Sequence, residues 1–131
     1  MPVTIEWDND DKTIVRMEMI GNWTWDEAYA GADQGYAMLD AVPYEVGTII
    51  DFSKGAHLPS NAISHARAMI KRRHPRTGLT VFVGTNAVFR SLWNIFSQVY
   101  TLFAHKQNSV FAANLAEARA ILHKQYSRTA Q

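Results

Sequence analysis

The residues whose types could do chemistry gather in one short stretch between a strand pattern and a helix pattern. Asp51 follows the apolar run VGTII, and Ser53, His57, Ser60 and Asn61 come soon after it. A serine, a histidine and an aspartate are the nucleophile, base and orienting acid of many hydrolases. The Gly-x-Ser-x-Gly turn that often carries such a serine is missing here, so the sequence does not favour a hydrolase.

Ser60 and Asp51 each have two interpretations. Ser60 precedes an apolar helical stripe, so its hydroxyl could be an N-cap that accepts a helix amide and contributes about 1 kcal/mol. It could also be a phosphorylation site, because the positive end of a helix stabilises a dianion. Asp51 could act as a base or cation ligand, or accept hydrogen bonds from loop amides. The residue types leave these alternatives open.

Composition argues against several other kinds of chemistry. The chain has no cysteine, which excludes a disulfide framework, a thiolate zinc site and a cysteine nucleophile. Its five histidines lack the His-x-x-x-His and Glu-x-x-His spacings that put two metal ligands on one helix face. We therefore expect no metal, no cofactor and no enzymatic activity.

The charge balance argues against a nucleic-acid partner. The net charge is +1, so no global field attracts polyanions. One basic patch ends a helix pattern, where cations offset the helix dipole, and no aromatic residues interleave with it. Its members are Lys71, Arg72, Arg73, His74 and Arg76. An acidic N-terminal stretch and the lack of a run of about 18 apolar residues predict a cytoplasmic protein without a signal peptide or transmembrane segment.

The elements that must position these residues follow from hydrophobic periodicity. Alternating apolar residues predict a β-hairpin within residues 3–19, and apolar runs at 46–52, 79–84 and 109–113 predict strands buried on both faces. Helical spacing predicts helices after Thr24, before Pro75, at 86–103 and from about Leu115. The order ββαβαβαβα predicts one α/β domain over residues 1–131 with a mixed, mostly parallel central sheet. Ligands of such sheets bind beyond the carboxyl ends of the strands.

This order of elements, together with the stretch TIIDFSKGAHLPSNA at residues 48–62, resembles the STAS family. These are the SpoIIAA-like anti-sigma-factor antagonist domains, with CRAL-TRIO-like proteins grouped near them. In that family a strand ending similar to Asp51, Phe52 and Ser53 leads through a loop to a turn with a phosphorylated serine. The resemblance implies that Ser60 is the switch. It also implies a non-enzymatic regulatory or protein-interaction domain acting through the loop from Asp51 to Asn61 and the following helix.

The helix pattern at residues 86–103 is the most apolar of the chain. Its apolar positions cover a wider arc than the stripe of about 100° that packing on a sheet requires. We expect the excess to meet a protein partner, an apolar ligand or a second copy of the chain, a homodimer being the first choice. The alternative function is a small apolar-ligand or lipid carrier, as CRAL-TRIO-like relatives imply, with its pocket near this helix. The residues proposed for this apolar face are Phe89, Trp93, Phe96 and Tyr100.

Overall fold

A computed structural model of the protein describes residues 2–55, 57–72, 74–87, 89–91, 94 and 109–126. Its strands are β1 (Val3–Trp7), β2 (Ile14–Ile20), β3 (Val46–Lys54), β4 (Thr77–Val83) and β5 (Ser109–Ala112). Its helices include α1 (Trp25–Asp40), α2 (Ala62–Lys71) and α4 (Leu115–Tyr126). Further helical residues begin at position 87, after β4.

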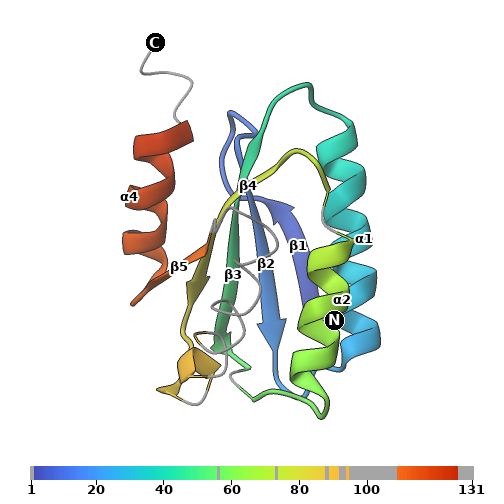
Figure 1. The fold of residues 1–131 in the computed structure, drawn as a ribbon. Helices are drawn as coiled ribbons and strands as arrows, with labels where there is room; N and C mark the ends of the chain where they lie inside the picture. Colours follow the sequence, from blue (N-terminus) through green and yellow to red (C-terminus); the bar gives the residue numbers. More distant parts are fainter. Residues whose placement is uncertain are drawn as a thin grey trace.

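The five strands form one sheet in the order β1-β2-β3-β4-β5. β1 is antiparallel to β2, and every other neighbouring pair is parallel. The predicted α/β class, the mixed and mostly parallel sheet and the parallel core of three strands are therefore confirmed. Right-handed crossovers that all step in one direction put their helices on one face. Accordingly, α1 and α2 cover one face of the sheet, and α4, which follows the last strand, covers the other (Figure 1).

Each face of the sheet has its own core. Toward α1, Trp23, Phe52 and Phe82 pack with apolar residues of β1 and β2. Toward α4, Ile49 and Val81 pack under the helix. The central strands β3 and β4 are buried on both faces, which explains their continuous apolar runs. β1 and β2, in contrast, alternate apolar and charged residues, because the charged side chains occupy the more exposed face of the hairpin.

The sequence around α1 explains both its start and its close approach to the sheet. The Thr24 hydroxyl accepts from the Glu27 amide (3.2 Å), and the Glu27 carboxylate accepts from the Thr24 amide (2.9 Å), forming a capping box. This confirms the helix start predicted at Thr24. A Cβ at Gly31 would lie 2.6 Å from the Val3 side chain, so glycine permits the contact with β1. Within the described ranges, no helix has both the length and the apolar character needed to cross a membrane.

Candidate functional site

The candidate site lies where β2 and β3 end at the same edge of the sheet. The Gly21 amide, just after β2, donates to the carbonyl of Lys54 at the end of β3 (2.7 Å). A Cβ at Gly55 would lie 2.8 Å from the backbone nitrogen of Gly21, so the two backbones are in close contact. The loop after β3 therefore starts in contact with the segment that leads into α1.

Two tryptophans of that segment attach the loop at both of its ends. The indole N–H of Trp23 donates to the carbonyl of Gly55 (2.9 Å), and that of Trp25 donates to the carbonyl of Ser60 (2.8 Å). Between them, His57 Nε2 donates to the Trp23 carbonyl (3.1 Å), since a carbonyl can only accept. The Trp23 side chain is 1% exposed and packs edge-on against Trp25. These contacts attach Gly55, His57 and Ser60 to the segment that leads into α1.

Asp51 is a buried residue near the end of β3 that binds the backbone of the same strand. It is 4% exposed, and its Oδ1 accepts a hydrogen bond from the amide of Ser53 (2.8 Å). Glu18 stands beside it in register on β2, and the Glu18 carboxylate lies 3.3 Å from Nζ of Lys54. Of the two interpretations of Asp51, this geometry matches the acceptor of loop amides.

The start of α2 differs from the expectation for Ser60. The helix begins at Ala62, and it is the carbonyl of Asn61 that accepts the first helical hydrogen bond, from the amide of His65 (3.1 Å). Asn61 has φ +66°, a left-handed conformation that asparagine adopts more readily than most residues. Ser60 therefore lies one residue too early to be the N-cap, and that interpretation is wrong. Its side chain is exposed, and its hydroxyl takes part in none of the hydrogen bonds among the described residues.

The structure does not bring together Ser60, His57 and Asp51, the residues that could form a hydrolase triad. Asp51 binds the Ser53 amide, His57 binds the Trp23 carbonyl, and no hydrogen bond among the described residues joins Asp51, His57 and Ser60 to one another. Within the same described part of the chain, no three histidine, cysteine or carboxylate residues come close enough to hold a metal ion. This geometry supplies no argument for hydrolytic or metal chemistry at the loop.

A contact between α1 and α2 was not anticipated from the sequence. The His65 ring stacks on Trp25, with centroids 4.9 Å apart and an angle of 19° between the planes. His65 Nδ1 also shares a hydrogen bond with the Tyr29 hydroxyl (2.8 Å). Trp25 and Tyr29 are four residues apart and therefore lie on one side of α1. That spacing predicts an aromatic face, but it does not reveal that the face meets a histidine instead of the sheet.

The basic patch is largely occupied by carboxylates of α1. The guanidinium of Arg72 pairs with Asp33 and lies 5.0 Å from the centre of the Tyr29 ring. Nε2 of His74 lies 2.7 Å from Asp40 Oδ1, while Arg76 donates to the carbonyl of Leu39 (3.1 Å). Arg73 lies outside the described residues. The patch thus binds α2 and the segment after it to α1.

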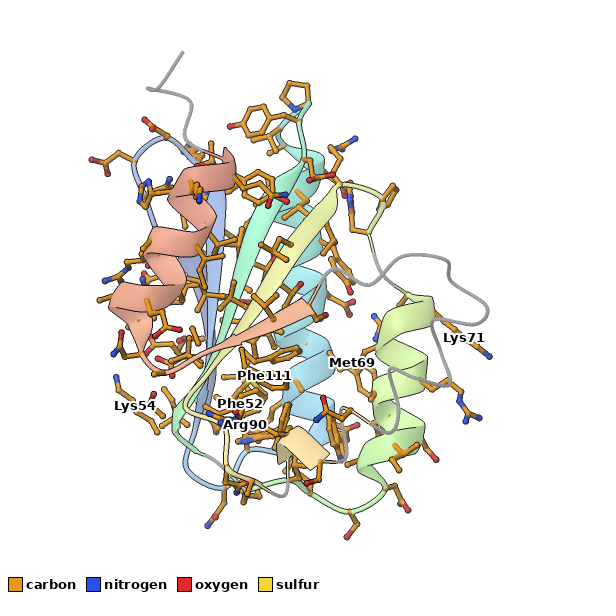
Figure 2. The ribbon with its side chains drawn as sticks, turned by 60° about the vertical axis from the view of Figure 1, so that its left-hand side comes forward. Phe52, Lys54, Met69, Lys71, Arg90 and Phe111 are labelled. Carbon is orange, nitrogen blue, oxygen red and sulfur yellow. The ribbon has the colours of Figure 1, made fainter. Side chains whose placement is uncertain are left out.

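The apolar face predicted at 86–103 is described only at its beginning. Phe89 is 8% exposed and packs on Phe52 and Phe82, with ring centroids 4.9 and 5.5 Å away. Phe52 and Phe111 lie near Arg90 (Figure 2), whose guanidinium is 5.8 Å from the Phe111 ring. Phe89 therefore belongs to the core. The other proposed residues of this face, Trp93, Phe96 and Tyr100, lie outside the described residues, and their role stays a prediction.

Comparison with protein-family models and with curated proteins finds no match for this chain. What the site can do must therefore be inferred from its geometry. It presents exposed polar side chains on a loop whose backbone is tied down by buried or half-buried rings. Such an arrangement is suited to recognising another molecule.

Proposed function

We propose that this protein is a non-enzymatic, cytoplasmic regulatory or protein-interaction domain that acts through residues 51–61, which comprise the end of β3 and the loop after it, and through α2. The observation that carries the proposal is the attachment of this loop by the indoles of Trp23 and Trp25. The side chains of Ser53, His57, Ser60 and Asn61 remain exposed on it. A loop that is attached at both of its ends loses less conformational entropy on binding, which favours its use as a recognition surface.

Ser60 is the switch residue of this proposal. Its carbonyl is fixed by Trp25, while its side chain is exposed just ahead of α2. A phosphate there would stand near the free amides at the helix start, which favour a dianion. It would also change the charge of the loop and so its affinity for a partner. A distant relationship to the STAS family is part of the proposal, supported by the place of Ser60 between β3 and α2.

Photo-crosslinking in the source cells tests the interaction role. A photoreactive residue replaces Ser60 or His57, and, as a control, Lys124, which is exposed on α4 at the opposite face of the sheet. We expect the same partner protein to be captured from both loop positions and not from position 124. Identical products from all three positions, or none from the loop, would contradict the proposal.

The switch role needs a second pair of variants. With the photoreactive residue at position 57, Ser60→Asp is expected to abolish the crosslink, because it places negative charge in the contact, whereas Ser60→Ala retains it. If both variants crosslink like the parent, Ser60 is not a switch, and the interaction role of the loop stands without it.

The carrier alternative receives no specific support from the described residues. At the described end of the 86–103 region, the rings of Phe52, Phe82 and Phe89 have centroids 4.9 to 6.4 Å apart, and all three are buried. Rings at these distances pack against one another. We therefore keep the interaction domain as the single proposed function.

A further inference from the structure

Acidic and basic residues are separated along this chain. No Asp or Glu occurs between Asp51 and Glu117, a span that includes all of α2. α1, in contrast, carries Asp26, Glu27, Asp33 and Asp40 but no lysine or arginine. A basic helix therefore lies beside an acidic one, and the charges on α2 must find their partners on other elements.

The side of α2 that faces α1 already has its partners. His65 meets Trp25 and Tyr29, and Arg72 at the helix end pairs with Asp33. Beyond the helix, His74 contacts the Asp40 carboxylate. Both of these α1 carboxylates are therefore engaged with residues at the end of α2 or after it. Together with the His65 contacts, they place one side of α2 against α1, so that its other side is turned outward.

That other side carries an outer ridge made of Ile63, Arg67 and Lys71. The three residues are four positions apart, so they follow one line along the helix, and all three are exposed. Ile63 is 42% exposed, more than the other large hydrophobic residues of the described chain. Lys71 extends away from the sheet, whereas Met69 lies on the side toward it (Figure 2). Among the described residues, neither Arg67 nor Lys71 forms an ion pair.

We propose that the outer ridge binds an acidic segment of a partner protein, with an apolar side chain of that segment set against Ile63. The inference rests on the proposed function, since α2 continues directly from the recognition loop. Arg67 and Lys71 are one helical turn apart, a spacing that carboxylates one turn apart on a partner helix can match. Because α2 has no carboxylate of its own, the partner supplies the neutralising charge.

The composition of the ridge favours a peptide over other polyanions. Surfaces that bind single-stranded nucleic acid combine cations with aromatic side chains on which bases stack, and the ridge has no aromatic residue. Helices that lie on membranes bury a broad apolar face, whereas the ridge offers Ile63 alone. An aliphatic residue in line with two cations fits a segment that combines one apolar residue with acidic residues one helical turn apart.

Selection of random peptides against the full-length protein tests the inference. We expect the selected peptides to be rich in Asp and Glu around an aliphatic or aromatic residue. The selected peptides are then synthesised and their affinity is measured. Arg67→Glu should lower this affinity by about tenfold or more, because it replaces attraction with repulsion. Lys124→Glu, an equal change at an exposed lysine of α4, should leave their affinity unchanged. Circular dichroism checks that both variants are folded, and Lys71→Glu provides an independent second variant of the ridge.

Several outcomes would overturn the inference. One is selection of peptides without acidic enrichment, and another is equal binding to wild type and to the Arg67→Glu variant. Tighter, Arg67-dependent binding of single-stranded DNA or of phosphatidylserine vesicles would assign the ridge to a different partner. A protein that crosslinks to position 60 but binds Arg67→Glu normally overturns the inference and leaves the proposed function standing. Acidic-peptide binding without any protein crosslinked at the loop supports the ridge and counts against the proposed function.

Discussion

At the scale of single residues, Asn61 sets the point where α2 begins. Its φ of +66° turns the chain out of the loop, and its carbonyl accepts the first hydrogen bond of the helix. A side chain with a branched β-carbon is strongly disfavoured in this conformation, whereas glycine adopts it freely. The identity of residue 61 therefore affects stability more than that of the neighbouring Ser60.

We predict that Asn61→Val lowers the free energy of unfolding by about 1 to 2 kcal/mol, whereas Asn61→Gly is tolerated. Ser60→Ala should change it by less than about 0.5 kcal/mol, because an exposed residue that is not the cap is removed. Urea titration of the three variants measures these differences. A larger loss for Ser60→Ala than for Asn61→Val would return the capping role to Ser60.

Asp8 of the hairpin binds two arginines, Arg16 of β2 and Arg119 of α4, and the second joins the hairpin to α4. Its side chain is 1% exposed, Arg119 binds both of its oxygens at 2.9 Å, and Arg16 pairs with it from β2. Burial acts to raise the pKa of Asp8, but the hydrogen bonds from Arg119 and Arg16 outweigh it and leave the pKa below its ordinary value. The ionised carboxylate therefore stabilises the folded state.

Asp8→Asn is expected to reduce the free energy of unfolding by about 2 to 3 kcal/mol at neutral pH. Because the pKa is lowered by folding, this contribution is present above the unfolded pKa of about 4 and is lost as pH falls through the folded pKa. Urea unfolding at pH 7 and pH 3 should show that the difference in free energy of unfolding between wild type and variant becomes smaller at pH 3. Asp10→Asn, in the exposed turn, is the control, and a gap that persists at pH 3 argues against the ion pair.

Tyr126 links the end of α4 to β4. Its hydroxyl accepts from the Leu79 amide and donates to Glu45, both at 2.7 Å. Burial, together with the Glu45 carboxylate, raises the pKa of Tyr126 to about 12. A Cβ at Gly78 would lie 2.1 Å from this hydroxyl, so glycine makes room for it.

We expect Tyr126→Phe to lower the free energy of unfolding by about 1 to 3 kcal/mol, since the Leu79 amide loses its acceptor. In wild type, the stabilisation linked to the raised pKa is complete below the unfolded pKa of about 10 and declines as pH rises toward 12. Unfolding experiments from pH 8 to 11.5 should therefore show wild type losing part of its advantage over the variant. Tyr44→Phe, whose hydroxyl donates to carbonyls of the exposed turn, should cost less.

At the scale of elements, α2 is attached through rings and charges more than through aliphatic packing. Among its side chains that the structure describes, none is buried. Among the described residues, its contacts with α1 include the Trp25–His65 stack and the Tyr29–His65 hydrogen bond, and Arg72, directly after the helix, pairs with Asp33. Exposed ion pairs contribute little, so the Trp25 contacts should dominate the attachment.

Trp25→Phe keeps a ring beside His65 but removes the N–H that binds the Ser60 carbonyl. We predict faster amide hydrogen exchange at residues 57–65, with unchanged protection in β3 and β4, because only the loop attachment is lost. Mass spectrometry of peptides from the exchanged protein measures this. Trp7→Phe, in β1, is the control. Unchanged exchange at 57–65 would mean that the indole hydrogen bond does not order the loop.

At the scale of the whole molecule, Phe89 is the residue of the proposed apolar face that the structure describes, and it lies on the inner side. Phe89 is buried among phenylalanines of the sheet, so Phe89→Glu places a charge in the core and should unfold the protein. We expect wild type to be a homodimer at micromolar concentration and Phe96→Glu to be a folded monomer. Sedimentation velocity with circular dichroism tests both, and a monomeric wild type would refute the dimer.

The sequence predicted those features that depend on local patterns. The apolar runs of β3 and β4 identify buried parallel strands, and Thr24 with Glu27 identifies the start of α1. The helical stripe from Ala62 matches the start of α2, but the sequence does not reveal that Asn61, with its positive φ, caps the helix in place of Ser60, or that Trp25 binds the Ser60 carbonyl. Likewise, no periodicity reveals that His65 meets Tyr29 or that α1 supplies carboxylates to Arg72 and His74. Such pairings arise only when the elements pack.

The strand order has a consequence for how the protein is made. Each strand lies next to the strand that precedes it in the chain, starting with the β1–β2 hairpin. A nascent chain leaves the ribosome from its N-terminus, so every new strand can join the edge of a sheet that has already formed, without waiting for a later one to be inserted. The partly made sheet then has one growing edge, at β2, then β3, then β4, and α4 closes the second face only after β5 has been added.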